Sequence, residues 1–192
     1  VGYVPDTSSA TYVSKRFMPK FDFKDTTVTS TLNRMSSWGN MLVVCDVTLS
    51  MSDAVAQLSV WYKVNYEKKS IKYLSLFNDG DGKGTRLKNI GSTGGIYHYS
   101  VQDSDEILPK IKKVMEKGSG GDIPENDIEA LLSGLKKNGD KIKDVVLIAD
   151  NSAKIRDYVL ISEIKRPVNV ILTNCKSVIN PQYLDLAYRT KG

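Results

Sequence analysis

The sequence has very little histidine and cysteine, and it lacks any long apolar run. His98 is the only histidine in the chain, and it lies in a Tyr-His-Tyr segment without a nearby cysteine. This argues against Ser-His-Asp, Cys-His and histidine-based zinc catalysis, and it favours a structural role for His98. Cys45 and Cys175 are expected to be small buried residues of predicted strands, and two cysteines do not define a redox compartment. No apolar run approaches the roughly 18 residues needed to span a bilayer.

Composition is that of a globular protein, with 41% hydrophobic and 26% charged residues among 192. The net charge of +5 arises from 27 basic and 22 acidic residues. The lysines occur in short groups on different predicted helices, and no nucleic-acid-binding motif accompanies them, so no nucleic-acid partner is expected. Because the chain starts at Val1 with nothing that resembles a leader sequence, we expect a processed form or a piece of a longer protein.

Alternating strand and helix patterns predict an α/β fold with a mostly parallel, doubly wound, Rossmann-like sheet flanked by helices. Strands are expected at 41–45, 71–77, 96–100, 144–149 and 168–173. Helices are expected at 53–68, 107–117, 128–138, 156–165 and 180–189. Residues 1–38 are interpreted as an N-terminal extension or linker, and residues 39–192 as the folded domain.

Three oxygen-bearing side chains alternate directly after the first predicted strand. Residues 41–45 (MLVVC) are apolar, and Asp46, Thr48 and Ser50 follow. Open α/β sheets place their ligands at the carboxyl ends of the strands, so the three side chains are expected at that edge, with Asp46 facing the surface. A carboxylate and two hydroxyls are hard ligands that suit a hard cation such as magnesium.

The same residues have simpler explanations that the sequence leaves open. Ser50 and Asp53 fit a capping box at the start of the helix that follows. Asp122 and Glu125 fit a second capping box, with a helix beginning near the proline between them. Asp150 would belong to an ordinary turn stabilised by its own side chain.

Two other loops resemble ligand-binding loops but lack their key residues. The glycine-rich residues 118–121 could bring backbone amides near an anion, yet no Lys-Ser or Lys-Thr pair follows as in a P-loop. Residues 78–84 (NDGDGKG) resemble the start of a calcium loop. However, Lys83 replaces an acidic ligand and Ile90 stands where the final glutamate is required, so this stretch is interpreted as a turn.

The arrangement around Asp46 resembles the metal-ion-dependent adhesion site of von Willebrand factor A domains. The signature of that site is Asp-x-Ser-x-Ser after the first strand, and Thr48 here replaces the first serine. Residues 118–122 (GSGGD) resemble the loop that normally supplies a threonine ligand, and Asp122 stands at that position. Residues 147–150 (LIAD) resemble the strand that ends in the last aspartate of the family. The resemblance covers approximately residues 39–192.

This resemblance implies a non-enzymatic binding module that holds one divalent cation, magnesium in the first place or else manganese or calcium. The partner would be another protein that completes the metal's coordination with an acidic side chain. Residues 118–125 and 147–157 resemble bacterial versions of the fold, which favours a secreted, periplasmic or cell-surface location. The implied metal ligands are Asp46, Thr48, Ser50, Asp122 and Asp150.

Two further functions remain open. A magnesium-dependent phosphoryl-transfer enzyme of haloacid-dehalogenase type also places an aspartate after its first strand. Its Asp-x-Asp-x-Thr signature requires a second carboxylate two residues later, where this chain has Thr48. The other possibility is a von Willebrand factor A scaffold whose metal site has decayed.

Overall fold

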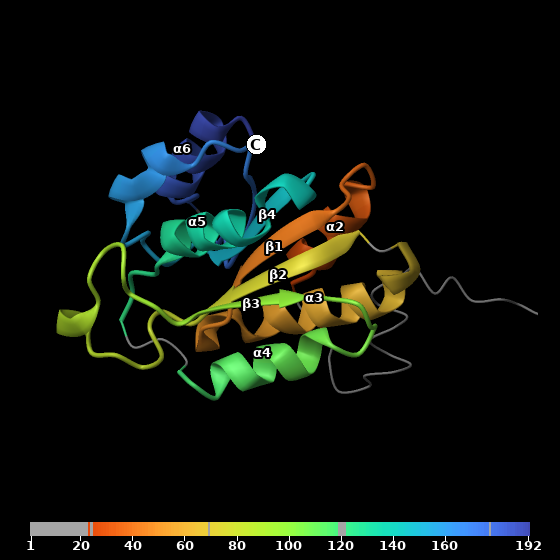
Figure 1. Ribbon diagram of the computed structural model, residues 1–192, viewed down its shortest axis with the longest axis horizontal. Coiled ribbons are helices and arrows are strands. Elements are labelled where there is room, and N and C mark those ends of the chain that lie inside the picture. Colours follow the sequence, from red (N-terminus) through yellow and green to blue (C-terminus); the bar gives the residue numbers. More distant parts are fainter. Residues whose placement is uncertain (1–22, 24, 69, 119–121, 177) are drawn as a thin grey trace, which may run out of the picture.

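The computed structural model describes residues 23, 25–68, 70–118, 122–176 and 178–192, which form a five-stranded sheet flanked by helices (Figure 1). The strand order is β3-β2-β1-β4-β5, and only the edge strand β3 runs antiparallel to its neighbour. None of the helices in the described ranges is both long and apolar enough to cross a membrane. The strands are β1 (Met41–Asp46), β2 (Ile71–Phe77), β3 (Ile96–Ser100), β4 (Val145–Asp150) and β5 (Asn169–Thr173).

The two central strands are apolar along their length because helices cover both faces of the sheet. Every residue of β1 and of β4 is buried. These strands are paired in parallel, with Cys45 opposite Ile148. Their carboxyl ends therefore lie at the same edge of the sheet, where Asp46 ends β1 and Asp150 ends β4.

The helices form two layers, one on each face of the sheet (Figure 1). One apolar cluster joins the sheet to α2, α3 and α4, and the other joins it to α5, α6 and a 3₁₀ segment. The helix α3 contributes buried residues on most of its circumference, as predicted from its sequence. The helices are α2 (Thr27–Arg34), α3 (Ser52–Asn65), α4 (Ile107–Met115), α5 (Asp127–Asn138) and α6 (Pro181–Thr190).

The predicted α/β class and the five strands are confirmed, whereas one helix and one buried cysteine are not. The helix expected at 156–165 is replaced by a short 3₁₀ helix, Tyr158–Glu163. Its backbone amides donate to carbonyls three residues earlier, as Leu160 N does to Asp157 O at 2.9 Å, and the Asp157 carboxylate accepts hydrogen bonds from the first amides of α5. Cys45 is buried as expected, but Cys175 lies exposed just beyond the end of β5.

The helix α2 belongs to the core although it precedes residue 39. Val28 is 0% exposed, and its backbone amide donates to the side chain of Gln57 on α3 at 3.0 Å. The proposed domain start at residue 39 stays a prediction, and α2, which precedes it, packs in the same apolar cluster as the sheet. The interpretation of residues 1–25 as an arm falls mostly outside the described residues.

Candidate functional site

Asp46, Thr48 and Ser50 line a turn that leads from a buried strand end to the surface. Asp46 is 1% exposed, which corrects the expectation that it faces the surface. Its Oδ1 accepts a hydrogen bond from the backbone amide of Thr48 at 2.7 Å. The hydroxyls of Thr48 and Ser50 lie 3.4 Å apart, and Ser50 is exposed. The three side chains therefore extend from the buried end of β1 to the protein surface.

Asp150 lies at the same edge as Asp46 because β1 and β4 are parallel neighbours. Its Oδ1 accepts from the amide of Ser152 at 2.8 Å, which is the turn hydrogen bond expected from the sequence. Burial raises the pKa of Asp46 to about 7, against hydrogen bonds from Thr48 that lower it, and the negative charges of Asp150 and Asp79 raise it further. Asp46 therefore lies close enough to Asp150 and Asp79 to feel their charges.

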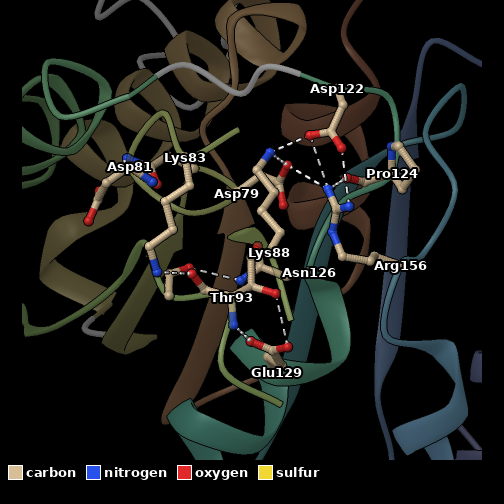
Figure 2. Close-up of polar contacts among 12 residues, drawn as sticks. Asp79, Asp81, Lys83, Lys88, Thr93, Asp122, Pro124, Asn126, Glu129 and Arg156 are labelled. Carbon is tan, nitrogen blue, oxygen red and sulfur yellow. Dashed lines mark hydrogen bonds and ion pairs between the residues drawn. The ribbon is translucent and has the colours of Figure 1, made fainter. Parts of the chain in front are cut away.

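Asp122 reaches the same edge, but two basic side chains already contact its carboxylate. Figure 2 shows Lys88 and Arg156 placed between Asp122 and Asp79, which follows β2. Arg156 Nη1 donates to Asp122 Oδ2 at 3.1 Å, and Lys88 Nζ pairs with Asp122 Oδ1. Burial alone would raise the pKa of Asp122, but hydrogen bonds from Lys88 and Arg156 outweigh it and hold the pKa well below its usual range. Its assignment as a metal ligand stays a prediction.

Neither predicted capping box forms. The helix α3 begins at Ser52 and its N-cap is Met51, so Ser50 does not cap it. The helix α5 begins at Asp127 with Asn126 as its N-cap, later than a capping box near Pro124 would require, so Asp122 does not cap it either. These simpler explanations for Ser50 and Asp122 are wrong.

Glu125 is a buried acid whose carboxylate is incompletely paired. It is 5% exposed, and within the described part of the chain its Oε2 has no hydrogen-bond partner. Burial raises its pKa to about 10, and the negative charges of Asp46, Asp79 and Asp127 act in the same direction. Its backbone is fixed by hydrogen bonds to Lys154 O at 2.8 Å and from the amide of Arg156 at 2.7 Å. The side chain is therefore held close to the other acids.

The long loop between β2 and β3 positions Lys88 by anchoring to α5. Glu129 accepts hydrogen bonds from the amide of Thr93 at 3.0 Å and from its hydroxyl at 3.1 Å. Asn126 Nδ2 donates to Gly94 O at 2.9 Å. Gly95 has φ +68°, and an added Cβ would lie 2.2 Å from the side-chain oxygen of Asn78 and 2.5 Å from the amide nitrogen of Gly80, so only glycine fits. These contacts are drawn in part in Figure 2.

Oxygen-bearing side chains of the kind that bind hard divalent cations lie at one edge of the sheet. Asp46 and Asp150 supply carboxylates and Thr48 and Ser50 supply hydroxyls at one edge of the sheet, where Glu125 adds an unpaired buried oxygen. None of the ion pairs among the described residues offsets Asp46 or Asp150, while burial raises the pKa of Glu125 to about 10 and so keeps that carboxyl group protonated near neutral pH. In the same described part, no group of three His, Cys, Asp or Glu side chains is arranged for a metal. A cation here would therefore depend on the hydroxyls and on water.

The fold and the site define an α/β protein with a Rossmann-like sheet and an acidic, hydroxyl-bearing site at the carboxyl edge of that sheet. No protein-family model, curated protein or solved structure matches this chain. Sequence reasoning missed Asp79, Lys88, Glu125 and Arg156 as neighbours of the site. The position of Asp79 soon after β2 was a usable signal, because β2 ends beside β1. Nothing in the sequence pattern points to Lys88.

Proposed function

We propose that this protein is a divalent-cation-dependent protein-binding module with a site of von Willebrand factor A type. The observation that carries the proposal is the uncompensated pair Asp46 and Asp150 at the ends of adjacent parallel strands, with two hydroxyls beside them. Asp46, Thr48, Ser50 and Asp150 would hold the cation, for which magnesium is the first candidate. When bound, the cation supplies Lewis acidity to a carboxylate of the partner protein.

The residues of the site have separable tasks in this proposal. Asp46 is fixed by the amide of Thr48, so its carboxylate has a defined orientation before any ligand arrives. Ser50 is the most exposed member and lies where a partner would approach. Asp122 is already in contact with Lys88 and Arg156, so it would join the cation only if those contacts changed.

Calorimetric titration with Mg²⁺ and Mn²⁺ tests the proposal. We expect the wild type to bind one cation and Asp46→Asn to bind it at least roughly 100-fold more weakly, because a charged ligand has been removed from a partly desolvated site. The matched control is Asp53→Asn, which removes an exposed carboxylate in the first turn of α3. Equal affinity in Asp46→Asn and wild type would refute the assignment of Asp46.

Partner binding requires its own measurement. Immobilised peptides with one glutamate or aspartate, paired with their Gln or Asn counterparts, serve as probes. We expect capture of the acidic peptides to require Mg²⁺ and to be abolished by EDTA. Capture that is indifferent to EDTA would argue for an interaction that does not use the site.

The phosphoryl-transfer alternative is distinguishable from binding. In haloacid-dehalogenase-type enzymes the first aspartate must reach the substrate, whereas Asp46 is 1% exposed and Thr48 replaces the second carboxylate. We therefore expect no hydrolysis of small aryl phosphates in the presence of Mg²⁺. Turnover that disappears in Asp46→Asn would replace the binding function with an enzymatic one. The absence of any cation binding would instead favour a decayed site.

A further inference from the structure

Lys88 is a buried ammonium group shared by two carboxylates from different loops. Its Nζ pairs with Asp79 Oδ2 and with Asp122 Oδ1, and the exposed fractions of the three side chains are 0%, 0% and 16% for Lys88, Asp79 and Asp122. Arg156 Nη2 contacts the same carboxylates, at 2.8 Å from Asp79 Oδ2 and 3.1 Å from Asp122 Oδ1 (Figure 2). Two positive and two negative groups thus form a neutral cluster.

This neutral cluster adjoins the uncompensated acids of the proposed cation site. Asp79 Oδ1 has no hydrogen-bond partner within the described residues, although Asp79 is completely buried. The register of β1 and β2 places Asp46 opposite Phe77, and Asp79 follows Phe77 by two residues at the same edge of the sheet. Lys88, which pairs with Asp79, therefore lies near the acids that would surround a cation.

The choice of lysine at this position has a chemical consequence. A buried lysine is costly unless it is paired, and its ammonium group is a compact charge on a flexible stem. Lys88 directly follows the 3₁₀ helix Thr85–Leu87, and its aliphatic chain places the ammonium group in the interior beside Asp79. Lys88 therefore supplies the two carboxylates with a single compact positive charge, as a bound metal ion would.

We infer that Lys88 is a tethered counter-ion that competes with a divalent cation for the carboxylates of Asp79 and Asp122 and so weakens cation binding at the Asp46 site. The inference rests on the function proposed above. With Lys88 in place, the ammonium group repels a dication that approaches the site, and Asp122 is already paired. Without Lys88, Asp79 and Asp122 keep only Arg156 as a counter-ion, so the cluster gains one negative charge and one carboxylate oxygen on each aspartate loses its ammonium partner.

The test is the affinity of Lys88→Met for Mg²⁺ alone, measured by calorimetry. Methionine has about the length of the buried aliphatic chain of lysine and lacks the ammonium group. We expect the dissociation constant to fall by at least roughly tenfold, because a positive charge close to the cation has been removed from a partly desolvated site. The matched control is Lys83→Met, a lysine of the same loop whose Nζ donates to the backbone oxygen of Thr93 at 2.7 Å. That control should leave the affinity unchanged.

The outcomes separate this inference from the proposed function. Tighter binding by Lys88→Met, with or without measurable binding by the wild type, supports the inference. The inference is overturned if the wild type binds Mg²⁺ as tightly as Lys88→Met does, or more tightly. No binding by either protein overturns the inference and, separately, refutes the cation-dependent function.

A second variant covers the case in which Lys88→Met is unfolded without cation. Lys88→Gln is neutral, yet its amide can donate hydrogen bonds to both carboxylates. Recovery of the folded far-ultraviolet circular dichroism spectrum by Mg²⁺ in either variant supports the inference, since the metal then replaces the ammonium group. Variants that remain unfolded at saturating Mg²⁺ overturn it, because Lys88 would then have a structural role that a metal cannot fill.

Discussion

Replacing Asp46 by asparagine separates the cation-binding role of this residue from its role in the fold. The side chain is 1% exposed and accepts the amide hydrogen bond of Thr48, which the oxygen of asparagine can also accept. The substitution removes a buried negative charge that lies near Asp150 and Asp79. Without cation, we therefore expect Asp46→Asn to be as stable as the wild type or more stable, by up to about 1 kcal/mol.

In the presence of cation the order of stability should reverse. A ligand at 100 times its dissociation constant stabilises the folded state by about 2.7 kcal/mol. For a domain of this size, that corresponds to an increase in melting temperature of roughly 5–11 °C. If Asp46→Asn weakens binding by about 100-fold, the same concentration stabilises it by only about 0.4 kcal/mol, or roughly 1 °C.

Thermal unfolding with and without Mg²⁺ measures this difference in two proteins and one control. Asp53→Asn, which removes an exposed carboxylate on α3, should show the full wild-type increase. The reasoning would be refuted by an identical metal-induced increase in Asp46→Asn and wild type. Unfolding of Asp46→Asn without cation would show instead that the charge of Asp46 is needed for the fold.

Three further predictions concern stability. Gly134→Ala should destabilise the protein by about 1 kcal/mol in urea unfolding, because a Cβ there would lie 2.7 Å from Ser75 Oγ and overpacking exceeds the gain in helix propensity. His98→Phe should cost about 1–3 kcal/mol in the same assay, since it leaves the buried hydroxyl of Ser75, 2.8 Å from His98 Nδ1, without that partner. Asp122→Asn should cost on the order of 2 kcal/mol at pH 7 by weakening the contact with Lys88. The lowered pKa of Asp122 makes its contribution complete above its unfolded pKa, so the difference between variant and wild type should shrink as the pH falls below about 4.

The strands were predictable because their signal is local and strong. The run that ends at Asp46 is buried on both faces, and the pattern predicted both the strand and its end. The last helix was equally clear, since Asn180 caps it and Pro181 opens it. The apolar spacing predicted α5 to within one residue of its start, but the contact of the Asp157 carboxylate with its first amides was not predictable, because Asp157 is distant in sequence.

The candidate site was likewise predictable where it lies at strand ends and not where it depends on contacts between loops. Asp46 and Asp150 follow apolar runs, so the edge of the sheet that they share could be predicted from strand patterns alone. The contacts of Asp122 with Lys88 and Arg156 could not, because they join three separate loops. A side chain that reaches its partner from a long loop leaves no periodic pattern in the sequence.

The distribution of charge explains why a cation would control partner binding. The chain carries a net charge of +5, yet within the described residues Asp46 and Asp150 lie at the site without a basic partner. A partner carboxylate that approached this edge would be repelled by like charges at close range. A bound dication would neutralise the two aspartates and present a positive centre, so the sign of the local interaction would change. In the proposed function, cation binding is therefore a condition for capturing an acidic partner, and Lys88 sets the cation concentration at which that condition is met.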